Sequence, residues 1–203
     1  MALTARLGLR RRRDADDSAI DLLSSRLLGY SADGRGWDPS GQRLIYPVEP
    51  DTAHAAHLAG RAYAAVRRDA GQIVVVSVLG RHEVKVTRFD QSGTVPAEVR
   101  EFHELDDRLW LRGIKRCNGG STVPADQQVT DWFTWVGPDT SATWTRFDHR
   151  SPQGRSHELR LDWNPADHWY DHPTFGDYDA LIGEPNVLAQ LWPDAEPLAF
   201  LGR

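Results

Sequence analysis

Short links between extended segments constrain this chain more than any other feature of its sequence. Ile73–Leu79 is nearly all β-branched and apolar, which indicates a strand buried on both faces. Gly80-Arg81 predicts a two-residue turn, and apolar and polar residues then alternate from His82 through Thr87 as in a second strand. Parallel neighbours need a crossover of about a dozen residues or more. Strands this closely spaced therefore predict antiparallel hairpins and argue against a doubly wound parallel sheet.

The rest of the chain adds further strands and a few helices to the expected fold. Extended patterns predict four more strands, at Leu109–Arg116, Val129–Val136, Ala142–His149 and His157–Trp163. Capping residues, apolar spacing or an initial Pro predict helices at Ser18–Leu28, Pro50–Asp69 and Pro96–His103, and a short one near Tyr178–Ile182 or Asn186–Gln190. This order predicts an α+β fold, in which an antiparallel sheet of about five to six strands has helices packed on one face.

The 203 residues suffice for one domain preceded by a basic tail. Residues 1–13 contain five arginines and no acid, and residues 14–203 are expected to form a single α+β domain. Asp14 follows the arginines directly, so the apolar stretch of a secretory signal is missing. A single cysteine, Cys117, excludes an intramolecular disulfide framework and a Cys-built zinc site. With no run of 18 apolar residues and no nucleotide-binding motif, we expect a cytoplasmic protein that contacts no membrane and carries no cofactor.

Charge is distributed unevenly, and the end of the chain is acidic. The net charge is −5, yet no Lys or Arg occurs between Leu161 and Gly202. Residues 164–203 are rich in Pro, acids and aromatic residues, which predicts an irregular acidic-aromatic segment. Such a surface attracts a basic protein but not nucleic acid, which only the N-terminal arginines are suited to contact. The predicted partner-binding residues are Asp162, Asp167, Trp169, Tyr170, Asp171, Asp177, Asp179 and Glu184.

Two histidines in the same segment offer a metal site as an alternative. His168 and His172 are four residues apart, and on a helix both would face the same way, beside carboxylates that could complete the ligand set. Pro165 and Pro173 enclose the pair, which argues against a regular helical turn there.

Four features follow one another in the last third of the chain. They are a Trp-led strand at Trp144, a turn at Gly154, a strand that ends in Asp162-Trp163 and the acidic, aromatic stretch Asp167–Trp169. With looser counterparts at Tyr178, Asp179 and Trp192, this pattern over residues 142–192 resembles the distal part of the YezG-like immunity proteins. The resemblance implies a small α+β protein that neutralises a polymorphic toxin, often a nuclease. The N-terminal helix and the Leu109–Val136 region have no counterpart in the pattern.

These observations favour a non-enzymatic protein-binding module of the immunity or inhibitor class. It would occlude a basic partner, such as a toxin, with its acidic and aromatic surface. Two alternatives remain open: a metal-dependent enzyme or metal-binding domain that uses His168 and His172, and a regulatory scaffold whose basic start and acidic end bind different partners.

Overall fold

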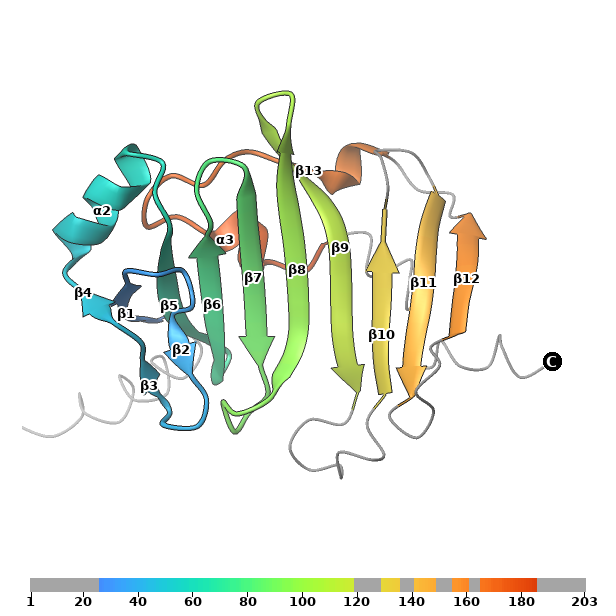
Figure 1. Cartoon of the computed structure of the whole chain (residues 1–203), viewed down its shortest axis with the longest axis horizontal. Coiled ribbons are helices and arrows are strands. Elements are labelled where there is room, and N and C mark those ends of the chain that lie inside the picture. The colour runs from blue at the N-terminus through green and yellow to red at the C-terminus, as the bar shows by residue number, and fades with distance from the viewer. Residues whose placement is uncertain (1–25, 119–128, 136–140, 149–154, 161–164, 186–203) are drawn as a thin grey trace, which may run out of the picture.

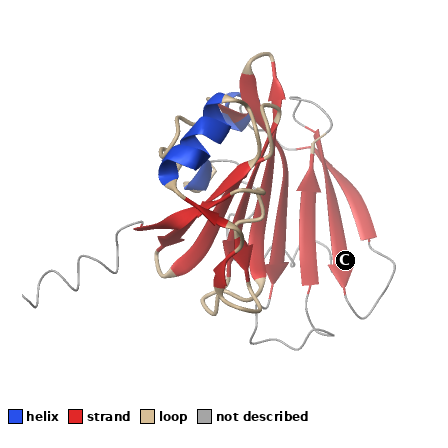
Figure 2. Ribbon diagram, turned by 60° about the vertical axis from the view of Figure 1, so that its left-hand side comes forward, coloured by secondary structure: helices blue, strands red, loops and turns tan. Residues whose placement is uncertain are grey.

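The computed structural model describes residues 26–118, 129–135, 141–148, 155–160 and 165–185. These residues form one large, twisted antiparallel sheet with a hairpin and two α-helices packed against it (Figures 1 and 2). The N-terminal basic tail and Asp162 lie outside the described residues. None of the helices in the described ranges combines the length and the hydropathy that spanning a bilayer requires.

The sheet has eleven strands, most of them in simple chain order. Eight consecutive strands form a meander: β5 (Tyr63–Asp69), β6 (Gln72–Val78), β7 (Glu83–Phe89), β8 (Pro96–Leu105), β9 (Arg108–Asn118), β10 (Val129–Thr134), β11 (Ser141–Asp148) and β12 (Arg155–Arg160). Outside β5, β1 (Arg26–Ser31) and then β4 (Pro47–Val48) extend the sheet. The short β13 (Trp169–Tyr170) pairs with the first residues of β9. The links that the structure describes, from β5 to β9, are short turns, as expected for antiparallel neighbours.

This architecture overturns the predicted α+β fold with five to six strands. Within the described residues the α-helices are α2 (Pro50–Leu58) and α3 (Asp179–Ile182); a short 3₁₀ helix, η3 (Pro165–His168), precedes β13. The predicted strands at the β6–β7 hairpin and at β9, β10, β11 and β12 are confirmed, as is the short helix at α3. The β6–β7 turn is longer than the predicted two residues. The amide of Leu79 donates to the Glu83 carbonyl, so that residues 80–82 form the turn.

Three predicted helical segments are strands over part or all of their described length. The helix that begins at Pro50 ends at Leu58, and two residues later Gly60 adopts a left-handed φ of +62°. The chain then turns into β5, where Tyr63–Val66 is buried on both faces. Pro96, predicted as the first residue of a helix, instead opens β8, where it pairs with Phe89 beside a register shift; the first residue of a strand also suits proline. Of the predicted helix at Ser18–Leu28, the described part, from Arg26, belongs to β1.

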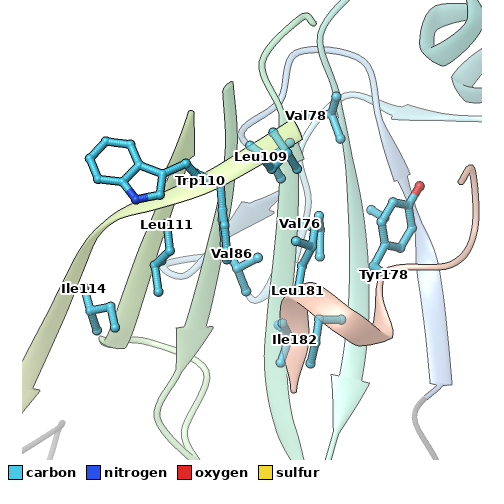
Figure 3. Close-up of a cluster of buried hydrophobic side chains, with 14 of the residues drawn as sticks. Val76, Val78, Val86, Leu109, Trp110, Leu111, Ile114, Tyr178, Leu181 and Ile182 are labelled. Carbon is cyan, nitrogen blue, oxygen red and sulfur yellow. The ribbon is translucent and has the colours of Figure 1, made fainter. Parts of the chain in front are cut away.

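The two faces of the sheet are covered differently. On one, here called the inner face, α3 places Leu181 and Ile182 against apolar residues of β6, β7 and β9 (Figure 3). On the other, called the outer face, the hairpin of β2 (Trp37–Asp38) and β3 (Arg43–Leu44) packs against β1, β5, β6 and Phe89 at the end of β7. Both faces of β6 are therefore buried at this end, which confirms the expectation drawn from its apolar run.

A buried ion pair lies on the inner face beside α3. Glu98 and Arg100 of β8 both point inward, and the Arg100 guanidinium lies 2.6 Å from the Glu98 carboxylate. Arg116 of β9 binds the other oxygen of the same carboxylate, also at 2.6 Å. Burial raises the pKa of Glu98, but the two guanidinium groups outweigh burial and hold that pKa below its usual 4.5. The pair therefore stabilises the fold above that usual value, and the contribution is lost as the pH falls through the lowered one.

We predict that Glu98→Gln lowers the free energy of unfolding by about 3–5 kcal/mol, because Arg100 would stay buried without its counter-charge. The matched control is Glu101→Gln on the same strand but the outer face. There Glu101 lies 3.8 Å from Lys85 in an exposed pair, and the loss should stay within about 1 kcal/mol. Urea unfolding of both variants at neutral pH measures the difference. Equal losses would contradict a special role for the buried pair.

Candidate functional site

Most of the predicted partner-binding residues lie on one segment, residues 169–185, here called the strap. From β13 the strap crosses the inner face toward α2 and returns to end in α3 (Figure 1). Its proximal end is held by the β13–β9 ladder, where Trp169 is paired with Trp110 and Tyr170 with Leu109. The segment predicted to be irregular thus has a defined course over the sheet.

Aromatic contacts hold the middle of the strap. Phe175 packs among Tyr30, His54, His57 and Tyr63, with ring centroids 4.7–5.9 Å away. The buried hydroxyls of Tyr63 and Tyr178 lie 3.0 Å apart, so a hydrogen bond joins the strap to β5. Rings in this range of separations contribute beyond the area that they bury.

Arginines from the sheet bind the C-terminal end of α3. Arg100 donates to the carbonyls of Leu181 and Ile182, each at 3.1 Å, and also to that of Gly183. Arg88 donates to the Ile182 carbonyl at 3.1 Å. The last carbonyls of a helix have no partner within the helix and carry a partial negative charge, so guanidinium groups stabilise them. These bonds determine where α3 docks.

Three of the strap acids form ion pairs with arginines of the sheet. Asp179 lies 2.6 Å from Arg67, Asp171 3.4 Å from Arg108, and Glu184 3.7 Å from Arg116. In every pair the carboxylate is the more exposed partner. The side-chain exposures are 77% against 12% for the Asp179 pair, 91% against 51% for the Asp171 pair, and 74% against 27% for the Glu184 pair. The strap therefore presents carboxylates to solvent above partly buried guanidinium groups.

The remaining predicted residues have mixed surroundings. Asp177 is exposed beside Asp179, whereas Asp167 is half-buried in η3. Trp169 and Tyr170 are both half-buried. The Arg108 guanidinium lies 5.7 Å from the Trp169 ring, and Tyr170 packs edge-on against Phe102. The two aromatic residues thus hold the strap to the sheet.

The two histidines of the alternative metal site occupy different environments. His168 is buried, with its Nδ1 3.3 Å from the Leu111 carbonyl and its ring edge-on to Trp135. His172 is exposed beyond β13, and the chain between the two is a strand instead of a helix. Among the described residues, no group of three or more His, Cys, Asp or Glu side chains is placed to hold a metal ion. The metal alternative therefore stays a prediction.

A cavity of about 320 Å³, here called the histidine pocket, opens beside the strap. Residues far apart in the sequence line it: His57 at the end of α2, Arg81 in the β6–β7 turn, Glu104 and Asp107 at the β8–β9 hairpin, and His172 of the strap. Their separation along the chain explains why sequence patterns did not reveal the pocket. Its volume is at the lower end of the range for ligand sites, about 300–1,000 Å³.

Hydrogen bonds link the pocket to the buried tyrosines of the strap. His57 Nδ1 lies 3.0 Å from the Tyr63 hydroxyl, which in turn contacts Tyr178. Burial, and to a smaller extent His54 and His172, lowers the pKa of His57 below 6.5, so its imidazole is neutral at neutral pH. Burial and the bond to Tyr178 raise the pKa of Tyr63, whose hydroxyl therefore stays protonated. The residues described as lining this pocket supply carboxylates and imidazoles but no hydroxyl or thiol nucleophile.

Comparison with known proteins finds no family model, no curated protein and no solved structure that matches the chain. The resemblance to the YezG-like immunity proteins therefore stays a prediction.

We predict that part of the pH dependence of stability comes from His168. Burial lowers its pKa below 6.5, although the Leu111 carbonyl and Asp167 act in the opposite direction. In the unfolded chain the His168 imidazole therefore binds a proton near pH 6.5, whereas in the folded chain it binds that proton only at a lower pH. The contribution is constant above about pH 6.5 and is lost as the pH falls below it, by up to about 1.4 kcal/mol per pH unit.

His168→Gln should reduce the pH dependence of the unfolding free energy between about pH 6.5 and pH 5. Urea midpoints measured at intervals of half a pH unit give this dependence. Comparison at pH 8 separates this effect from lost packing against Trp135, because packing loss is independent of pH. An unchanged slope would show that His168 takes no part.

Proposed function

We propose that this protein is a non-enzymatic binding module of the cytoplasm, of the immunity or inhibitor kind, which covers a basic region of a partner protein with the strap. The observation that carries the proposal is the asymmetry of the three strap ion pairs. In each, the carboxylate faces solvent and the guanidinium lies deeper.

Such an arrangement suits protein recognition for two reasons. The exposed carboxylates attract cationic side chains and accelerate encounter with a basic partner. The arginines beneath them and the β13–β9 ladder already restrict the strap, so binding loses less conformational entropy than it would with a free segment. The mechanism is occlusion of the partner surface, and it requires no bond chemistry.

The resemblance to the YezG-like immunity proteins supports the same class of function. A toxin that acts on nucleic acid needs a cationic surface to bind phosphates. An anionic strap of this length would complement such a surface and compete with the nucleic acid for it.

We predict that the triple variant Asp171→Asn, Asp177→Asn, Asp179→Asn associates about three- to tenfold more slowly with its partner at low salt, with a weaker salt dependence. Asn keeps a hydrogen-bonding side chain at each position, so the strap should remain docked. The partner is first captured from lysate of the source organism and identified. It is then purified, and association rates are measured with purified proteins from about 50 to 300 mM salt.

The matched control carries Glu49→Gln, Asp51→Asn and Asp106→Asn, which remove three exposed acids outside the strap. Asn tolerates the left-handed backbone at position 106, where φ is +52°. The control should retain the rate of the unmodified protein within about twofold. Equal slowing of both variants would indicate a nonspecific effect of net charge, and an unchanged rate in the strap variant would refute the proposed surface.

A further inference from the structure

The histidine pocket combines an apolar floor with a polar rim. Val78 of β6 and Val84 of β7, 7% and 2% exposed, contribute the apolar surface. Glu104, Asp107 and His57 contribute polar groups from three different elements. A long side chain with an aliphatic stem and a charged end is the kind of group that such a cavity accommodates.

The pocket is continuous with the strap. His172 and Pro173, which line it, directly follow Asp171. A partner that lies on the anionic strap therefore passes the mouth of this cavity. Interfaces draw much of their affinity from single side chains that fill such pockets, and arginine is among the commonest of these.

The charges of the lining favour a cationic occupant. Glu104 lies 2.7 Å from His82 and keeps 20% of its side chain exposed, whereas Asp107 is exposed at the hairpin tip. The neutral His57 adds no positive charge. Arg81 is the opposing group. Its stem crosses Gly60, where an added Cβ would lie 2.6 Å from Arg81 Nε, and the described lining contains two carboxylates besides this one guanidinium.

We infer that the histidine pocket receives an arginine side chain of the basic partner, with the stem on Val78 and Val84 and the guanidinium at Glu104 and Asp107. The inference rests on the proposed function. Arginine fits better than lysine because its planar fork can bond two carboxylates at once, and because it is less strongly hydrated than an ammonium group.

The inference can be tested without the partner, by using N-acetyl-arginine N-methylamide as the probe. Binding is followed by NMR as shifts of the His57, Gly60, Gly80 and His172 signals during titration. A single side chain should bind with a Kd on the order of 1 mM. The citrulline counterpart, which has nearly the same shape but no charge, should bind at least about tenfold more weakly, as expected when a charge-assisted hydrogen bond is lost.

The inference predicts that two sets of variants change the affinity for the arginine probe in opposite directions. Glu104→Gln and Asp107→Asn should each weaken binding of the arginine probe about three- to tenfold, and Arg81→Gln should strengthen it, because a like charge is removed. Asp51→Asn, an exposed acid of α2 outside the lining, is the control and should leave the Kd unchanged. Folding of each variant is checked by its urea midpoint.

Several results would overturn the inference. One is equal binding of the arginine and citrulline probes, and another is the absence of shifts up to about 20 mM probe. Preferential binding of N-acetyl-glutamate N-methylamide that is lost in Arg81→Gln would identify an anion site instead. These outcomes leave the proposed function standing if the strap variant still slows association. A strap variant without effect, beside normal probe binding, would refute the strap surface alone.

Discussion

The buried contact of Glu98 with Arg100 and Arg116 determines how the rest of the inner face is arranged. A buried ion pair adds little stability compared with apolar residues of the same size, but its unused donors must find acceptors. Arg100 finds them in the last carbonyls of α3, so the charge pair in β8 positions a helix 80 residues further along the chain. Once α3 is placed there, Leu181 and Ile182 close the core, and the strap has a fixed end point.

The same ion pair explains why a helix was wrongly predicted where the structure has β8. β8 alternates correctly for a strand, but its inward positions Glu98 and Arg100 are charged, so the pattern did not resemble a half-buried strand. β5 was missed for another reason: its Ala-rich start continues the composition of α2, and the two are separated by a turn of four residues, 59–62, that contains the left-handed Gly60. Strands with apolar or plainly alternating patterns, such as β6, β7 and β9, were predictable because each obeys one local rule. Charge pairs satisfied by distant segments follow no local rule.

The candidate site was predictable to a similar degree. A run of eight acids without Lys or Arg is visible in the sequence, and the structure places four of them on the strap. The sequence could not show that Arg67, Arg108 and Arg116 lie beneath these acids, because those arginines belong to β5 and β9. Nor could it show the histidine pocket, whose lining comes from α2, two hairpin turns and the strap. In both cases the missing information is tertiary contact between segments far apart in sequence.

The paired arginines weaken the long-range attraction of the strap for a basic partner but leave its carboxylates available at contact distance. Five acids lie between residues 165 and 185, and three arginines pair with them, which leaves a local charge of about −2. Beyond a Debye length of about 8 Å only this small net charge is felt, so steering of a partner is moderate at physiological salt. At contact distance the outward carboxylates act individually, since their arginines lie deeper. Discrimination between basic partners must then come from short-range fit, for which the pocket beside His172 provides a defined shape.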